Sequence, residues 1–180
     1  MNYDHALTLP LSARDLAGLK PGETCLLSGP LYTLRDAGHV RLLAESAEAG
    51  ELPYGLAGQA IFYAGPTPAP VAGTPAEGRP FGAIGPTTAS RMDFAAPALY
   101  DAGIVATIGK GTRSEEVRQA CKRNGAVYLT CTGGAAALLA RCVESSDTIS
   151  YDDLGTEALR RIEVCDFPCV VAIDSKGMER

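Results

Sequence analysis

Hydroxyl and cationic side chains gather in one short stretch near the middle of the chain, residues 85–93 (Gly-Pro-Thr-Thr-Ala-Ser-Arg-Met-Asp). The Gly-Pro pair is typical of a turn that ends a strand, because proline lacks a backbone N–H and has a fixed φ. Thr87 or Thr88 then lies where a helix beginning at Ala89 would need a cap. Free N–H groups at a helix start attract anions. Arg91 has the wrong charge for that position unless it points into solvent or an anion lies beside it, so the stretch predicts a site for a small carboxylate or phosphate.

A second arginine follows a second Gly-Pro break. Thr33 is predicted to cap a helix that runs to about Gly50, which places Arg35 in its first turn. The two arginines, Arg35 and Arg91, each follow an apolar strand and a Gly-Pro pair. This repetition indicates two sides of one pocket.

Lys110 follows a third apolar stretch and is flanked by two glycines. Ligands of open α/β sheets bind at the carboxyl ends of strands, and glycines let a ligand approach the backbone. With Arg35 and Arg91, Lys110 would form a group of three cations suited to a small dicarboxylate, since arginine binds a carboxylate through two parallel hydrogen bonds. The surrounding residues do not match the nucleotide-binding pattern G-x-x-x-x-G-K-S/T.

Each of these residues also has a simpler interpretation. A lone threonine at such a position more often caps a helix than acts as a base, although neighbouring cations would lower the cost of an alkoxide. A lysine between glycines is often an exposed turn residue. The residues alone leave both interpretations of Thr87, Thr88 and Lys110 open.

Composition restricts the class of protein. The chain has 180 residues, 46% apolar and 21% charged, which predicts a single globular domain over residues 1–180. A net charge of -5 argues against nucleic acid as the main partner. We expect no membrane association, since no apolar run is long enough to span a bilayer, and a cytoplasmic location, since the N-terminus lacks a signal-peptide pattern. The six cysteines have no C-x-x-C spacing, so free buried thiols are expected rather than a zinc site.

Periodicity predicts alternating strands and helices with short links in the second half, and hence an α/β fold with a partly parallel sheet and a second layer of strands. Residues 66–80 read as a proline-rich loop, and Pro97 as a break in the helix that begins at Ala89. The expected strands are 7–11, 24–28, 60–64, 104–108, 126–130 and 169–174. The expected helices begin at a Ser12–Asp15 capping box, at Thr33, at Ala89, at a Thr112–Glu115 capping box and at Gly133-Gly134, with partly helical structure over residues 151–161.

Residues 85–93 resemble the signature of the C-terminal domain of class I, iron–sulfur-dependent fumarases. The same domain occurs as the separate beta subunit of two-subunit fumarases and L(+)-tartrate dehydratases. Further matching segments follow in the order of that family and cover nearly the whole chain: residues 31–39, 62–67, 109–111, 133–136 and 167–177.

The resemblance implies a swivelling three-layer β/β/α domain and a reversible hydro-lyase reaction, the hydration of fumarate to L-malate. It implies a 4Fe–4S cluster whose three cysteine ligands lie on a partner alpha subunit, so that this chain binds no metal, and an assembly that is a dimer of heterodimers. By the family's pattern Thr87 matches the catalytic base. Arg35, Thr87, Arg91 and Lys110 match the contacts to the dicarboxylate substrate.

Two positions depart from the family's pattern. Gly38 stands where alanine is expected, and Ser90 where many relatives have glycine, so that Ser90 is a candidate for tuning the choice of substrate. Dehydration of tartrate to oxaloacetate is the alternative reaction. A non-catalytic binding or assembly module on the same fold is the alternative class, although such a module would be expected to lose some of the four site residues.

Overall fold

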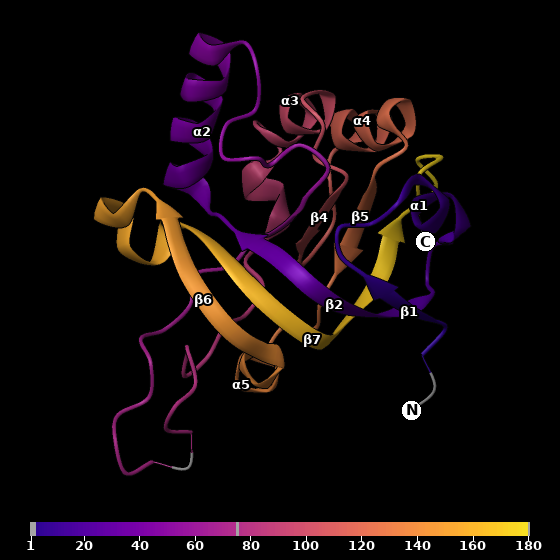
Figure 1. The fold of residues 1–180 in the computed structure, drawn as a ribbon. Coiled ribbons are helices and arrows are strands. Elements are labelled where there is room, and N and C mark those ends of the chain that lie inside the picture. The colour runs from indigo at the N-terminus through magenta and orange to yellow at the C-terminus, as the bar shows by residue number, and fades with distance from the viewer. Residues whose placement is uncertain (1–2, 75, 180) are drawn as a thin grey trace.

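The computed structural model describes residues 3–74 and 76–179 (Figure 1). Its strands are β1 (His5–Thr8), β2 (Thr24–Thr33), β3 (Ala60–Phe62), β4 (Ala106–Gly109), β5 (Val127–Thr130), β6 (Val143–Ser150) and β7 (Leu159–Ile173). Its α-helices are α1 (Ala13–Gly18), α2 (Asp36–Ala49), α3 (Ala96–Asp101), α4 (Glu115–Asn124) and α5 (Ala136–Leu139). Short 3-10 helices are η1 (Ala89–Met92), η2 (Ala140–Cys142) and η3 (Asp152–Glu157).

The described residues form a seven-stranded sheet in the order β1-β2-β3-β4-β5-β7-β6, with a further pairing of β2 with β7. Strands β1 to β5 pair with one another in parallel. Strand β7 is antiparallel to each of its neighbours, β2, β5 and β6. Val170 of β7 pairs with Thr24 of β2 on one side and with Thr130 of β5 on the other. The double pairing closes β2, β3, β4, β5 and β7 into a ring, and confirms the partly parallel sheet.

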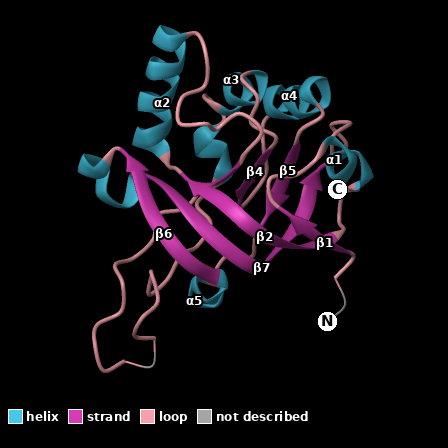
Figure 2. Ribbon diagram, in the orientation of Figure 1, coloured by secondary structure: helices cyan, strands magenta, loops and turns pink. Residues whose placement is uncertain are grey.

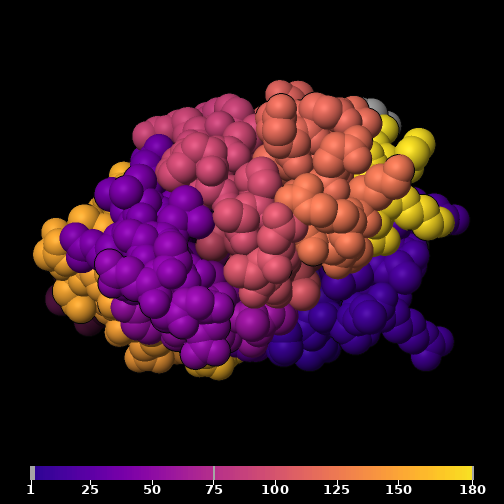
Figure 3. Space-filling model, turned by 90° about the horizontal axis from the view of Figure 1, so that it is seen from above, coloured from indigo at the N-terminus to yellow at the C-terminus, as the bar shows by residue number. Residues whose placement is uncertain are grey.

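The side chains of the ring fill two separate apolar cores. Successive residues of a strand point to opposite faces, so Phe62 of β3 packs inside the ring while Ile61 packs outside it. Phe62 meets Phe167 of β7 inside the ring, with 5.1 Å between the ring centroids. Helices α2, α3 and α4 cover the outer core (Figure 2) and form a continuous surface seen from above (Figure 3). The expected three-layer β/β/α arrangement is therefore confirmed.

Local signals at two helix ends are confirmed. Ser12 accepts a hydrogen bond from the Asp15 N–H, and the Asp15 carboxylate accepts one from the Ser12 N–H, which is the predicted capping box at the start of α1. Helix α2 ends at Gly50, whose left-handed backbone (φ 74°) suits glycine. The strands expected near residues 60–64, 104–108 and 126–130 are present as β3, β4 and β5.

The predicted end of the second strand at Gly29-Pro30 is wrong, because β2 continues to Thr33. The register between β2 and β7 shifts between Leu27 and Gly29, so the strand bends there rather than ending. Strand β1 pairs with β2 only as far as Ser28, and β3 begins to pair at Tyr32. Pro30 falls in the gap between these two neighbours, where no N–H is required.

The C-terminal third differs most from expectation. Strand β6 was not predicted, and β7 begins at Leu159 rather than near residue 169. Among the described strands, β6 pairs only with β7, and it carries mostly polar, partly exposed side chains, so it lacks the apolar pattern of a buried strand. The alanine-rich helix begins at Ala136, later than the predicted start at Gly133-Gly134, and continues as η2 to Cys142, close to its predicted end at about Val143.

Two further predictions near helix starts differ in detail from the structure. Ser114, not Thr112, caps α4 and accepts a hydrogen bond from the Val117 N–H. The predicted division of the helical structure after Ala89 into two short pieces is present as η1 and α3, but the break falls before α3 begins, and Pro97 lies in the first turn of α3, where a missing N–H costs nothing.

We expect Gly38→Ala to lower the free energy of unfolding by about 1 kcal/mol, although alanine favours helices. A Cβ on Gly38 would lie 2.4 Å from Leu34 Cδ1 and 2.8 Å from the backbone oxygen of Glu157. Urea denaturation of the purified chain measures the change. Gly18→Ala is the matched control, because a Cβ on Gly18 meets no atom of the described residues within 4 Å. If Gly38→Ala lowered the free energy of unfolding no more than Gly18→Ala does, or raised it, the backbone at Glu157 would have moved away from the added Cβ.

Candidate functional site

The predicted site residues lie on the connections that follow strands of the ring. Arg35 comes two residues after β2, and Lys110 directly follows β4. Thr87 precedes η1, and Arg91 is within it. The Thr87 N–H donates to the Tyr63 carbonyl at the end of β3 (2.7 Å), so the carboxyl ends of β2, β3 and β4 position all four residues.

The structure brings Thr87 and Lys110 together through their backbones. The Lys110 N–H donates to the Thr87 carbonyl (3.1 Å), and the Ala89 N–H donates to the Lys110 carbonyl (2.9 Å). These two hydrogen bonds make residues 87–89 run beside β4 like one more short parallel strand. Glycine is needed at the contact, since a Cβ on Gly109 would lie 2.9 Å from Ala89 Cβ.

Asp36 brings Arg35 and Arg91 together. Its Oδ1 lies 2.7 Å from Nη2 of Arg91, and its Oδ2 lies 3.7 Å from Nη2 of Arg35. Glu157 Oε1 lies 3.7 Å from the same Arg35 nitrogen. The Arg91 side chain is 51% exposed and the Arg35 side chain 23%, so both side chains retain some access to solvent. The residue types gave no signal that Asp36 would bridge the two arginines.

The predicted threonine caps are wrong. Thr33 is the buried last residue of β2, where its backbone pairs with Arg160 of β7, and Arg35 is itself the N-cap residue of α2. Thr88 precedes η1, but its side chain makes no capping hydrogen bond to any described residue. Because η1 is a 3-10 helix of four residues, its dipole is a weak reason for an anion to bind there.

His39 lies beneath Arg35 and is fully buried. Its Nδ1 is 2.8 Å from the Arg35 carbonyl oxygen, which can only accept, so Nδ1 carries the proton and donates. Burial lowers the pKa of His39 to about 4, so the ring is neutral at pH 7. The ring packs edge-on against Tyr63, with 5.2 Å between the centroids.

Arg113 is a buried cation that sequence reasoning missed. Its Nε donates to Oδ1 of Asp93 (2.7 Å), and the Ser114 N–H donates to Oδ2 of the same carboxylate (2.7 Å). The guanidinium group lies against the rings of Tyr63 and Tyr128, at 5.3 Å and 4.8 Å from their centroids. Arginines are mostly exposed, so nothing in the local sequence distinguishes this one.

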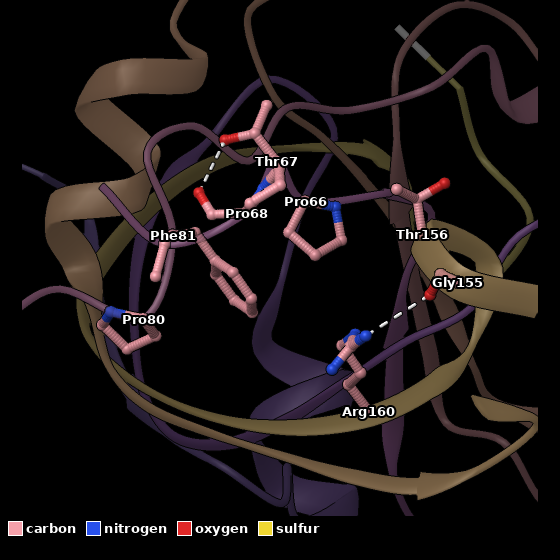
Figure 4. Close-up of a pocket in the computed structure, with 9 residues that line it drawn as sticks. Pro66, Thr67, Pro68, Pro80, Phe81, Gly155, Thr156 and Arg160 are labelled. Atoms are coloured by element: carbon pink, nitrogen blue, oxygen red, sulfur yellow. Dashed lines mark hydrogen bonds between the residues drawn. The ribbon is translucent and has the colours of Figure 1, made fainter. Parts of the chain in front are cut away.

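A cavity of about 400 Å³ lies beside the proline-rich loop (Figure 4). Its lining contains none of the four predicted site residues, and consists of Pro66, Thr67, Pro68, Ala69, Pro80, Phe81, Gly155, Thr156 and Arg160. Gly65 separates it from Arg35, since a Cβ there would lie 3.0 Å from Arg35 Cδ and 2.9 Å from the Thr156 carbonyl oxygen. Lys110 is exposed. Its simpler interpretation, a lysine in a turn, predicts the same exposure.

The six cysteines are free thiols, and four of them, Cys25, Cys121, Cys131 and Cys169, are buried. Within residues 3–74 and 76–179, no three His, Cys, Asp or Glu side chains are grouped so as to hold a metal ion. Burial raises the pKa of the Cys121 thiol to about 11 and of the Cys131 thiol to about 12, whereas metals bind the thiolate. In the same ranges, no helix is long and apolar enough to cross a membrane.

The family profile described as "Fumarase C-terminus" matches residues 4–180 of the chain. The aerobic class I fumarate hydratase of Escherichia coli (strain K12) is 39% identical over 153 residues, which cover 84% of this chain and 27% of that protein. Fumarate hydratase 2 of Leishmania major is 38% identical over 159 residues, covering 87% and 27%. The chain therefore spans about a quarter of the length of these relatives.

A different relative matches along most of its own length. The protein named "Putative L(+)-tartrate dehydratase subunit beta" in Methanocaldococcus jannaschii is 36% identical over 171 residues, which cover 93% of this chain and 86% of that protein. The same kind of unit therefore occurs both as part of a longer chain and as a chain of similar size.

We expect His39→Asn to flatten the pH dependence of stability between about pH 4 and pH 6.5. The unfolded state binds a proton at His39 in this range while the folded state does not, so stability is present above the unfolded pKa and falls as pH falls. A difference of about 2.5 pKa units corresponds to about 3 kcal/mol lost on acidification. Urea unfolding at several pH values measures the slope. Equal slopes in the two proteins would contradict the buried, neutral state of His39.

Proposed function

Because the chain belongs to the fumarase C-terminus family, we propose that it is the beta subunit of a hydro-lyase that reversibly hydrates fumarate to L-malate. We propose residues 1–180 as a single domain of that enzyme. The observation that carries the proposal is the grouping of Arg35, Arg91, Thr87 and Lys110 at adjoining strand ends. That arrangement provides cations and a hydroxyl at one edge of the sheet.

The cations bind the two carboxylates of the substrate. Arg35, Arg91 and Lys110 contribute three positive charges, and the neighbouring carboxylates Asp36 and Glu157 remove two. The site therefore keeps a net positive charge that favours a dianion. Asp36 occupies only part of each guanidinium group, and the remaining N–H donors suit a carboxylate.

Thr87 is the proposed base. In the dehydration direction its alkoxide would take a proton from the carbon next to the hydroxyl-bearing carbon of malate. The electron pair of that C–H bond would form the double bond of fumarate as the C–O bond breaks and hydroxide leaves. The hydroxide takes up a proton to become water, and Thr87 loses the proton that it accepted. A threonine hydroxyl is too weakly acidic to ionise unaided near neutral pH, and the charges of Lys110 and Arg91 lower that cost. The hydrogen bond from the Lys110 N–H to the Thr87 carbonyl supports their proximity.

The chain needs a partner to complete the enzyme. We propose an alpha subunit that carries the ligands of a 4Fe–4S cluster, a proposal supported by the lack of a group of three metal ligands among the described residues and by the burial of the Cys121 and Cys131 thiols. The relative named as a beta subunit supports a separate partner chain, and the long fumarate hydratases support a partner region in the same enzyme. A dimer of heterodimers in the cytoplasm is the assembly and location that we propose.

Dehydration of L(+)-tartrate is the second candidate reaction. The relative that matches this chain along most of its own length carries that name. Tartrate has one more hydroxyl than malate, and Ser90 is an exposed hydroxyl directly before Arg91. A non-catalytic module is less well supported, because all four proposed site residues are present.

We expect Thr87→Ala to reduce turnover by about 10²-fold or more, because it removes the proton acceptor and leaves the cations in place. The measurement is an anaerobic assay of the reconstituted two-chain complex, with malate and tartrate tested side by side. Thr88→Ala is the matched control, since the Thr88 side chain is exposed and makes no capping bond to the described residues. A Thr87→Ala complex with full activity would exclude Thr87 as the base.

We expect Arg91→Lys to raise the KM for the dicarboxylate about tenfold, because a single ammonium replaces a two-pronged donor. Steady-state kinetics of the same complex would measure the change. Arg14→Lys in α1 provides a control, since Arg14 is an exposed arginine on a different helix. Unchanged kinetics for Arg91→Lys would remove Arg91 from the substrate contacts.

A further inference from the structure

We propose that Arg113, through its ion pair with Asp93, is a positioning residue that sets the placement of Arg91 relative to Lys110. Neither Arg113 nor Asp93 belongs to the group of residues proposed to contact the substrate. The expected effect on catalysis rests on the proposed function. The expected effect on the placement of Arg91 rests on the geometry alone.

The two segments that bear Arg91 and Lys110 are joined at two places. The first is the pair of backbone hydrogen bonds that links residues 87–89 to Lys110. The second is the Asp93 carboxylate, which accepts from Arg113 Nε and from the Ser114 N–H, both at 2.7 Å. Arg91 lies between the two attachments, in a helix of only four residues. Without the second attachment, the segment that carries Arg91 would be held to this neighbour only at its start.

The guanidinium group of Arg113 has one well-defined orientation. Its side chain is 0% exposed, and Nη1 donates to Thr107 Oγ1 in β4 at 3.1 Å. Nη2 lies 3.5 Å from the Tyr63 hydroxyl, and the group is bounded by the rings of Tyr63 and Tyr128. A planar donor fixed on several sides can hold Asp93 in one position, as a flexible surface pair cannot.

Tyr63 extends the same buried network to the other half of the site. Its carbonyl accepts from the Thr87 N–H, and its ring contacts His39, which in turn donates to the Arg35 carbonyl. Arg113 therefore lies at the centre of a network that reaches the backbone of Thr87 and of Arg35.

Stability alone is a weak reason for this buried ion pair. A buried ion pair stabilises a protein little more than apolar side chains of the same volume would, because both charges lose their hydration. Removal of only one partner, by contrast, is strongly destabilising. Helices α3 and α4 are also joined near their ends by Arg123 and Asp101, whose two hydrogen bonds are both 2.6 Å and whose side chains are about half exposed. An arginine–aspartate pair thus links the same region without burial, and this pair serves as a natural control.

The decisive variant is Asp93→Asn/Arg113→Met, which removes both charges and so avoids an unpaired buried ion. We expect hydrogen exchange at the Ala89 and Lys110 amides of the purified full chain to become at least about tenfold faster. In the reconstituted complex we expect KM for malate to rise about tenfold, with a smaller effect on kcat, because misplaced cations bind the substrate less well. Asp101→Asn/Arg123→Met should change neither quantity.

Several results would overturn the proposal. One is a double variant whose exchange rates at the Ala89 and Lys110 amides and whose KM for malate equal those of the unmodified protein. An equal acceleration of exchange at the Leu9 amide, which donates to the Ser28 carbonyl and belongs neither to the site segments nor to the Arg113 network, would overturn it as well, because it indicates a general loss of stability. If the double variant does not fold, Arg113→Lys, which retains the charge but not the planar donor, decides by the same two measurements. An inactive unmodified complex would count against the proposed function, and the exchange result would still test the positioning role.

Discussion

The pairing of β7 with both β2 and β5 is the constraint on which the rest of the fold depends. The first five strands alone would leave β5 as an open edge, and its unpaired backbone groups would need another partner. By lying antiparallel between β2 and β5, β7 closes the ring and encloses the inner core around Phe62 and Phe167. Closure also fixes the carboxyl ends of β2, β3 and β4 at one edge, from which the connections bearing Arg35 and Lys110 begin.

The connections themselves are held by charged side chains more than by regular structure. Helix η1 is too short to be rigid alone, and residues 87–89 make only two backbone hydrogen bonds to the neighbouring segment. The carboxylates of Asp36 and Asp93 provide further attachments for this segment. Asp36, at the start of α2, pairs with Arg91 of η1, and Asp93, directly after η1, accepts from Arg113 and Ser114. The geometry of the proposed site therefore depends on acidic residues as much as on the cations that would contact a substrate.

The parts of the fold that were predictable from the sequence are those that local chemistry decides. The capping box at Ser12 and the end of α2 at Gly50 need only neighbouring residues, and the buried parallel strands have continuous apolar runs. Strand β6 and the first half of β7 were missed because they are defined by pairing with distant segments, β6 with β7 and β7 with both β6 and β2, and because the exposed face of β6 is polar. Thr33 was misassigned as a cap for the same reason: pairing with Arg160 draws it into β2, which no nearby residue indicates.

The placement of the proposed site residues at neighbouring strand ends was predictable from spacing, but the contacts among them were not. The predicted position of Arg35 and Arg91 after Gly-Pro breaks, and of Lys110 between two glycines, indicated that the three cations lie at one edge of the sheet. The ion pairs of Asp36 with both arginines agree with this for Arg35 and Arg91. Two neighbouring guanidinium groups repel each other, and Asp36 offsets that repulsion by lying between them. Because this carboxylate belongs to the chain itself, the arginines are brought together before any substrate is present. A dianion would then meet donors that are already assembled, and the ordering of flexible side chains would subtract less from its affinity.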